Sequence, residues 1–297
     1  MNNENKNYPF LSIGLLLSLF VLLGIILVRH HPSLSQKEQP THPPVFFDEK
    51  LFYEGVSRAK KESRPFPYRV YGGIIPHHSF PSFIIAGFFS RLSHQEPTTI
   101  ILVGPNHFER GSFKALTSLF AWQTPFGKVT PNVSLINRLL ERNLVKIDEE
   151  TLSTEHSIFE IMPYIKFYLP KTSVIPLILS SRITKEEVGV LANELANYLK
   201  DVSTVIIAPV DFSHNLTNNK AQERDKITLK IMKDFDYRQL FTLDNRYLDS
   251  PASVATLLMV MDKLSATKFD ILAHTNSGEL QKNDSIETTS YFSIAFY

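Results

Sequence analysis

The sequence contains no cysteine. This absence excludes disulfide scaffolds, thiolate zinc sites, iron–sulfur clusters and a cysteine nucleophile. Metal or acid–base chemistry must therefore use the 10 histidines and the carboxylates. Because the chain has no thiols, it folds equally well in reducing and oxidising compartments, and its cysteine content does not indicate where it is located.

The chain also lacks an excess of charge of either sign, with 31 Lys and Arg residues against 30 Asp and Glu residues. Nucleic-acid-binding proteins normally carry a basic excess, so we expect no nucleic-acid partner. Hydrophobic residues make up 43% and charged residues 21% of the 297 residues. This balance is typical of a globular protein and excludes long disorder.

One long apolar run stands near the N-terminus. After a short tail (residues 1–8), residues 9–28 carry no charge, and about 20 apolar residues are enough to span a bilayer as a helix. We therefore predict a single-pass anchor in the lipid bilayer, with a buried core helix or a cleaved signal peptide as alternatives. The flanking basic residues are nearly balanced, and we favour an extracytoplasmic domain.

A proline-rich polar stretch follows the apolar run. Residues 29–44 contain four prolines and the histidines His30, His31 and His42. This composition predicts an extended, solvated linker rather than a metal-binding tract. Residues 45–297 show no internal repeat and no second linker, so we expect them to form one domain.

In the domain, short apolar runs alternate with helical patterns. The strand-like runs cover residues 68–75, 98–104, 173–179, 203–210, 269–274 and 291–297. The helical patterns cover residues 81–92, 132–142, 185–199, 219–235 and 253–264. Short continuous apolar runs suit strands that are buried on both faces. The alternation predicts an α/β domain, a three-layer α/β/α arrangement with a mostly parallel central sheet.

Polar residues follow three of the predicted strands. His77 and His78 follow the first, His107 follows the second, and Asp211 and His214 follow the fourth. Taken singly, each is explained by a turn, a helix cap or the surface. The carboxyl ends of parallel strands meet at one edge, however, and imidazole is a common metal ligand. Together these residues predict a shared metal site.

A further histidine, His156, lies in the stretch Thr154–Ser157. This stretch reads as the start of a helix, with Ser153 or Thr154 as its N-cap. One interpretation is a capped helix and nothing more. The other is that His156 donates a hydrogen bond to a substrate or to a ligand carboxylate.

The order of these motifs resembles the Memo-like family, also called AmmeMemoRadiSam system protein B. The matching segments are Ile75-Pro76-His77, Leu102 to His107, Trp122 to Gly127, Glu155 to Ile158 with Pro163-Tyr164, and Asp211 to His214. The resemblance implies a fold like that of the class III extradiol dioxygenases, with a non-haem metal site. It also implies copper or iron binding, redox activity and a functional link to AMMECR-type and radical SAM proteins.

The resemblance makes His77 and His107 the expected metal ligands, with Asp211 and His214 beside them. Many family members supply a cysteine before the late helix, and Asp249 is the best match to it here. A carboxylate suits Fe(II), Mn(II) or Zn(II) better than Cu(I), so we favour iron over manganese, zinc or copper. Asp249 is equally well explained as a helix cap, in which case His214 becomes the third ligand.

The chain departs from the family pattern elsewhere too. The family stretch Glu-His-Ser-x-Glu-x-His continues here as Phe159-Glu160-Ile161, and Ser79-Phe80 replaces a Gly-Tyr. We expect Asp211, His156 and His78 to take the catalytic roles.

Three functions follow from these expectations. The first is a metal-dependent oxidoreductase, dioxygenase-like, that acts on an unknown small-molecule substrate. The second is a tethered, catalytically inactive module that binds a ligand or a peptide. The third is a zinc-dependent hydrolase that activates water. Metal content separates the three.

Overall fold

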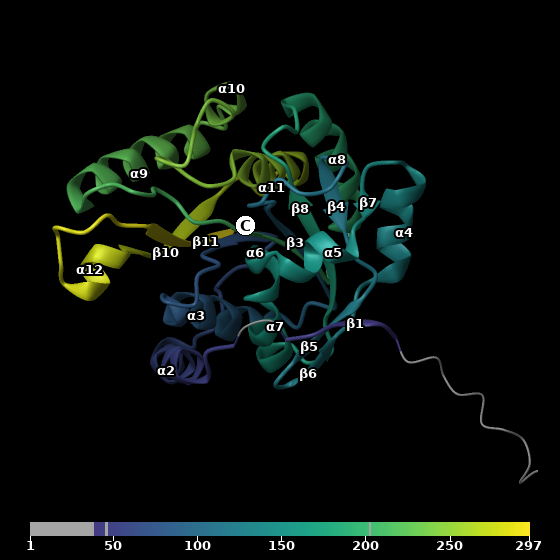
Figure 1. The fold of residues 1–297 in the computed structure, drawn as a ribbon, viewed down its shortest axis with the longest axis horizontal. Coiled ribbons are helices and arrows are strands. Elements are labelled where there is room, and N and C mark those ends of the chain that lie inside the picture. Colours follow the sequence, from purple (N-terminus) through teal and green to yellow (C-terminus); the bar gives the residue numbers. More distant parts are fainter. Residues whose placement is uncertain (1–38, 45–46, 202) are drawn as a thin grey trace, which may run out of the picture. The chain divides into compact units, whose positions relative to one another are not determined.

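The computed structural model describes residues 39–44, 47–201 and 203–297 of the chain. These residues form a central sheet with helices packed on both faces (Figure 1). Among the helices of these ranges, none is both long and apolar enough to cross a bilayer. The predicted anchor, residues 9–28, and the first ten residues of the predicted linker lie outside the described part.

The main sheet has eight strands in the order β10-β11-β2-β9-β3-β8-β4-β7. Their bounds are β2 (Gly72–Ile75), β3 (Thr99–Pro105), β4 (Ala115–Thr117), β7 (Lys146–Ile147), β8 (Ser173–Leu179), β9 (Thr204–Pro209), β10 (Phe269–Asn276) and β11 (Ser290–Phe296). The four central strands are parallel, as predicted. All six predicted strands are present.

The prediction of a mostly parallel sheet needs correction at the two flanks, where strands pair antiparallel. The sheet is therefore mixed. β11 pairs antiparallel with β2 and with β10, and β4 pairs antiparallel with β8. The connection from β10 to β11 holds only α12 (Ser277–Gln281). A helix this short spans about 8 Å, far less than the strand it would have to run back along. The chain therefore returns as an antiparallel neighbour.

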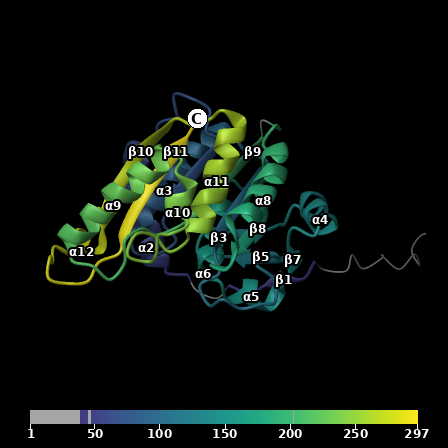
Figure 2. The same cartoon turned by 90° about the horizontal axis from the view of Figure 1, so that it is seen from above.

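The helices cover the sheet in two layers (Figure 2). Besides α12, their bounds are α2 (Glu49–Ala59), α3 (Ser82–Leu92), α4 (Val133–Glu141), α5 (Glu149–Thr154), α6 (His156–Phe159), α7 (Met162–Tyr168), α8 (Lys185–Tyr198), α9 (Asn218–Lys233), α10 (Tyr237–Leu240) and α11 (Pro251–Leu264). The five predicted helical segments correspond to α3, α4, α8, α9 and α11.

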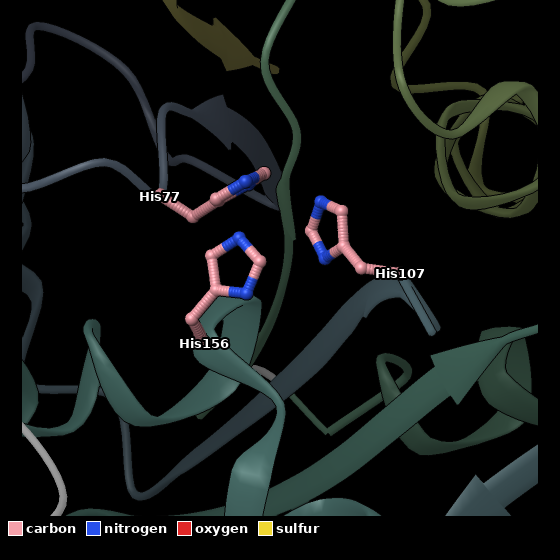
Figure 3. A group of neighbouring side chains, drawn as sticks. All are labelled: His77, His107 and His156. Carbon is pink, nitrogen blue, oxygen red and sulfur yellow. The ribbon is translucent and has the colours of Figure 1, made fainter. Parts of the chain in front are cut away.

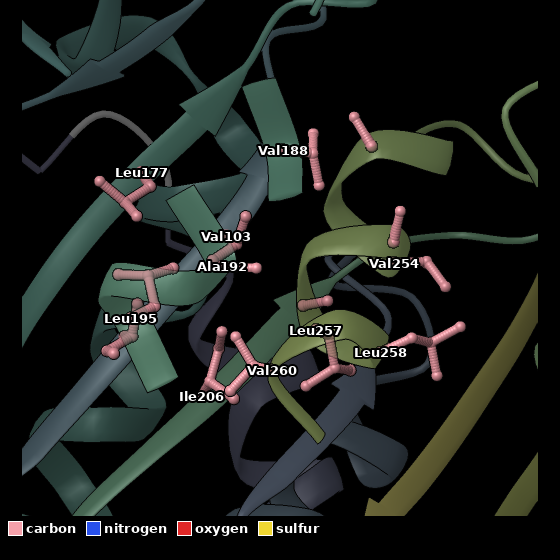
Figure 4. Packing of buried hydrophobic residues seen from close by; sticks show 14 of the residues in the cluster. Val103, Leu177, Val188, Ala192, Leu195, Ile206, Val254, Leu257, Leu258 and Val260 are labelled. Atoms are coloured by element: carbon pink, nitrogen blue, oxygen red, sulfur yellow. The ribbon is translucent and has the colours of Figure 1, made fainter. Parts of the chain in front are cut away.

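Alternate residues of each central strand enter opposite cores. In β3, Ile101 and Val103 pack in the core beneath α8 and α11, whereas Ile100 and Leu102 pack in the core beneath α2, α3 and α7. Figure 4 shows the first of these cores, where side chains of α8 and α11 meet those of β3, β8 and β9. Because both faces are covered, these strands read as continuous apolar runs.

A small second sheet places part of the predicted linker inside the fold. Its strands are β1 (Thr41–His42), β5 (Ala121–Thr124) and β6 (Gly127–Val129), and β1 pairs with β5. The prediction of a solvated linker is wrong for His42, whose side chain is 3% exposed. Its Nε2 lies 2.8 Å from Ser118 Oγ and 3.1 Å from Glu149 Oε2, and its ring packs on Trp122. Buried partners therefore hold this end of the linker.

We expect His42→Ala to lower the free energy of unfolding by about 2–4 kcal/mol, because it opens a cavity beside Trp122 and removes a partner of Ser118 and Glu149. Thermal unfolding followed by circular dichroism measures the change. His94→Ala, at an exposed position, is the matched control. Equal melting temperatures for the two variants would show that the contacts of His42 contribute nothing.

Candidate metal centre

The polar residues that were predicted to follow the strands lie together at one edge of the sheet. His77 follows β2, His107 follows β3 and Asp211 follows β9, and these strands are neighbours in the order β2-β9-β3. Asp249 arrives just before α11, and His156 opens α6. In Figure 3 the rings of His77, His107 and His156 converge from three different elements. Their ligand nitrogens lie within 4.8 Å of one another.

His77 is buried and has one ring nitrogen without a partner. Its Nδ1 lies 3.2 Å from the carbonyl oxygen of Pro209, which only accepts, so Nδ1 carries the proton. Nε2 is then an unprotonated acceptor, fully buried and without a hydrogen-bond partner. Burial lowers the pKa of His77 and keeps the ring neutral. A neutral imidazole with its lone pair directed into a polar pocket is suited to bind a metal ion.

Glu155 fixes the orientation of His107. The carboxylate of Glu155 accepts from the His107 backbone N–H at 2.9 Å and from Nδ1 at 2.7 Å. Nε2 of His107 therefore faces the site, 3.6 Å from Asp249 Oδ2. Burial acts against the imidazolium, but the carboxylates of Asp249 and Glu155 outweigh it and raise the pKa of His107 to about 9. Metal must therefore displace a proton from this ring.

Asp249 places a carboxylate beside both His77 and His107. Its Oδ2 lies 3.5 Å from His77 Nε2 and 3.6 Å from His107 Nε2. The side chain is only 4% exposed, and its Oδ1 is buried without a partner. Ser250, not Asp249, caps α11, because its side chain accepts from the Ser253 backbone N–H. The alternative interpretation of Asp249 as a helix cap is therefore wrong.

His156 lies against His107 rather than beside it. The two rings are stacked, with centroids 4.1 Å apart and an interplanar angle of 25°. An ion in the plane of one ring then lies above the face of the other, so the pair is poorly arranged to share an ion. Burial and the nearby His77 and His107 lower the pKa of His156 to about 4. The N-cap of α6 is Glu155, which corrects the predicted cap at Ser153 or Thr154.

Asp211, His78 and His214 border the two histidines. Asp211 is buried, accepts from the His77 backbone N–H at 3.2 Å and hydrogen-bonds Nδ1 of His78. The side chain of His78 is 46% exposed. His214 Nδ1 is buried without a partner, and a ligand atom of each of Asp211, His214 and Asp249 lies within 4.8 Å of the others. All seven predicted site residues thus lie in one connected cluster.

An open cavity of about 630 Å³ adjoins this cluster. His107 and Asp249 are among its lining residues, together with the apolar Phe241 and Leu243 and the charged Arg246. A cavity of this volume is in the range that accommodates a small molecule.

Sequence reasoning missed the role of Glu155. The sequence placed Glu155 only in a segment that resembles the family, yet its carboxylate accepts two hydrogen bonds from His107, 48 positions earlier in the chain. Hydrogen bonds from a carboxylate to the second nitrogen of a ligand histidine are a recurring feature of metal sites. The available signal in the sequence was a glutamate directly before a histidine, Glu155 before His156, in a segment that resembles the family.

We expect Glu155→Gln to weaken metal binding about 10–100-fold, because the amide holds His107 less firmly and makes it less basic. The affinity of the unsubstituted protein should rise with pH up to about 9, where His107 loses its proton. In the variant the pKa of His107 falls, so this rise should end at lower pH. Metal titrations from pH 6 to 9 measure both effects.

Glu150→Gln is the control for this comparison, since Glu150 is exposed on α5. An unchanged affinity and an unchanged pH profile in Glu155→Gln would contradict the positioning role of Glu155.

The chain is similar in sequence to proteins of a described family. Residues 57–294 match the family model described as Memo-like protein. A MEMO1 family protein of Nitrosopumilus maritimus is 26% identical over 236 residues, which cover 76% of this chain and 84% of that protein. Another, from Sulfurisphaera tokodaii, is 27% identical over 208 residues, which cover 67% and 72% of the two chains.

A solved structure shares the fold. An uncharacterised protein from Escherichia coli K12 superimposes with a TM-score of 0.53 at 13% identity, over 77% of this chain and 100% of that one. At this identity the likeness concerns the fold alone. The family model matches most of the chain, and the chain therefore belongs to the Memo-like family.

Proposed function

We propose that this Memo-like protein binds a divalent transition metal at His77, His107 and Asp249 and uses it in redox chemistry on a small molecule. One observation carries the proposal. His77 Nε2 is buried without a hydrogen-bond partner, and it lies 3.5 Å from a carboxylate oxygen that is also 3.6 Å from His107 Nε2. A polar atom left unpaired in this way costs free energy unless a ligand satisfies it.

The donor set argues for the kind of metal. Two imidazoles and one carboxylate suit Fe(II), Mn(II) or Zn(II), and the set contains no soft thiolate that favours Cu(I). We favour iron, because two histidines and one carboxylate are the ligands of many non-haem Fe(II) oxygenases. When bound, such an ion supplies open coordination positions and redox chemistry with oxygen.

The surrounding residues supply binding and proton handling. The cavity beside His107 and Asp249 accommodates the substrate. His156 is neutral near pH 7, because its pKa is lowered to about 4, and its ring nitrogen is available to accept a proton. Asp211 stays ionised, since its contacts with His77 and His78 outweigh its burial and lower its pKa to about 2. It thereby orients both histidines.

Metal content tests the proposal. The full chain is purified without chelator or nickel, and metals are measured by mass spectrometry in the unsubstituted protein and in His77→Ala/His107→Ala. We expect near-stoichiometric iron or manganese that is absent from the double variant. His94→Ala, which alters an exposed histidine, should retain the metal.

The other outcomes identify the other functions. Zinc that is lost in the double variant would favour a hydrolase that activates water. No metal in either protein, even after reconstitution, would favour a ligand-binding module without catalysis. Oxygen consumption with candidate substrates then tests redox activity directly.

We also propose that residues 9–28 tether the domain to a membrane and that the domain is extracytoplasmic. The support is the sequence alone, which places about 20 uncharged, mostly apolar residues before the domain. Carbonate extraction of membranes tests the tether, and protease protection of the domain tests its side. Recovery of the full chain in the soluble fraction would contradict the tether.

A further inference from the structure

Two buried atoms near the site are left over when His77, His107 and Asp249 Oδ2 are assigned to one ion. They are Asp249 Oδ1 and His214 Nδ1, and both are buried without a hydrogen-bond partner. The side chain of Asp249 is only 4% exposed. Water does not reach either atom from the surface, so each is an unsatisfied donor or acceptor in the folded chain.

The two residues that carry these atoms belong to a second group of possible ligands. Asp211, His214 and Asp249 each offer a ligand atom within 4.8 Å of the others. Asp249 is shared with the first set, because its Oδ2 faces the Nε2 atoms of His77 and His107. A carboxylate has two oxygens with lone pairs on each, so one aspartate is able to bridge two ions.

We propose that the chain holds a second divalent cation at Asp211, His214 and Asp249, with the Asp249 carboxylate as the bridge between the two ions. This inference rests on the proposed metal function of the first site. Carboxylate-bridged ions in two-metal sites lie about 3.5–4 Å apart. The bridge uses both carboxylate oxygens of Asp249. The second ion thereby satisfies Asp249 Oδ1, which is otherwise unpaired.

The neighbouring contacts prepare Asp211 for this role. Its Oδ1 accepts from the His77 backbone N–H, and its Oδ2 bonds Nδ1 of His78, so the carboxylate is fixed in orientation yet retains free lone pairs. The backbone N–H of Asp249 donates to the Asp211 carbonyl oxygen at 3.1 Å, and the backbone N–H of Asp211 points to Asp249 Oδ2 at 3.3 Å. The two carboxylates are therefore held side by side.

The charges also favour a second cation. Asp211 and Asp249 are two buried carboxylates in direct backbone contact. One histidine with two carboxylates is a mixed nitrogen and oxygen set, which suits Mn(II), Fe(II) or Zn(II). We therefore use Mn(II) as the probe, because a bridged pair is distinguishable by its electron paramagnetic resonance spectrum.

The test is an anaerobic titration of the metal-free full chain with Mn(II) alone. Bound manganese is counted by mass spectrometry, and the spectrum is recorded at saturation. We expect two ions per chain and an exchange-coupled signal. His214→Ala should bind one ion and give an isolated six-line signal. His94→Ala, with an exposed histidine replaced, should behave like the unsubstituted protein, and circular dichroism should show that all variants are folded.

Failure of this inference is distinguishable from failure of the proposed function. One ion in the unsubstituted protein, lost in His77→Ala but kept in His214→Ala, would overturn the second site and leave the first intact. Two ions retained in His214→Ala would also overturn it. No bound ion in the folded, unsubstituted protein would overturn both.

Discussion

Asp249→Cys is expected to change the metal preference of the protein from iron or manganese to Cu(I). The substitution converts two imidazoles and one carboxylate into two imidazoles and one thiolate, and thiolates select soft ions. The carboxylate of Asp249 lies 3.5 Å and 3.6 Å from the two ligand nitrogens, so a thiolate at this position stays within reach of the same ion. We expect Cu(I) to bind at least about 100-fold more tightly and Fe(II) to bind more weakly.

Competition titrations with a Cu(I) chelator under reducing conditions measure this change. Asp249→Asn is the matched control, because it keeps the shape of the side chain, removes its charge and supplies no sulfur. It should weaken binding of both ions. A Cu(I) affinity that is the same in Asp249→Cys and Asp249→Asn would show that position 249 is not a ligand.

This prediction depends on a residue that the sequence identified only by comparison. The histidines after the strands could be predicted from the chain alone, because parallel strands bring their carboxyl ends to one edge. Asp249 follows no strand, and it was expected only from the resemblance to the family. In the structure its Oδ2 lies 3.5 Å from His77 Nε2 and 3.6 Å from His107 Nε2, and Ser250 rather than Asp249 caps α11.

Other features were beyond the reach of sequence patterns for physical reasons. Periodicity reports burial but not strand direction, so it identified β10 and β11 without their antiparallel pairing. β1 has only two residues and lies among prolines, and its burial arises from pairing with β5, about 80 positions further along. The hydrogen bond between Glu155 and His107 likewise joins residues far apart in the sequence, so no local sequence pattern predicts it.

Asp211→Asn is expected to lower the free energy of unfolding of the metal-free protein by about 3 kcal/mol at neutral pH, since it breaks buried charge-assisted contacts. Asp211 is fully buried, bonds both His77 and His78, and is in backbone contact with Asp249. One residue therefore connects the ends of β2 and β9 to the start of α11. Asn has nearly the same volume as Asp but carries no charge. The decrease in the free energy of unfolding therefore reports electrostatics rather than packing.

The pH dependence of this loss is the sharper test, because its sign is fixed by the pKa of Asp211. That pKa is lowered from 3.8 to about 2, since the contacts of Asp211 with His77 and His78 outweigh the effect of burial. A lowered pKa stabilises the fold above pH 3.8, and this contribution, roughly 2 kcal/mol, disappears as the pH falls through about 2. The difference between Asp211→Asn and the unsubstituted protein should thus shrink between pH 4 and pH 2. Urea unfolding at several pH values measures it, with Asp262→Asn on the exposed side of α11 as control. A difference that stays constant down to pH 2 would mean that Asp211 acts through its hydrogen bonds, and that its charge contributes nothing to holding the two histidines.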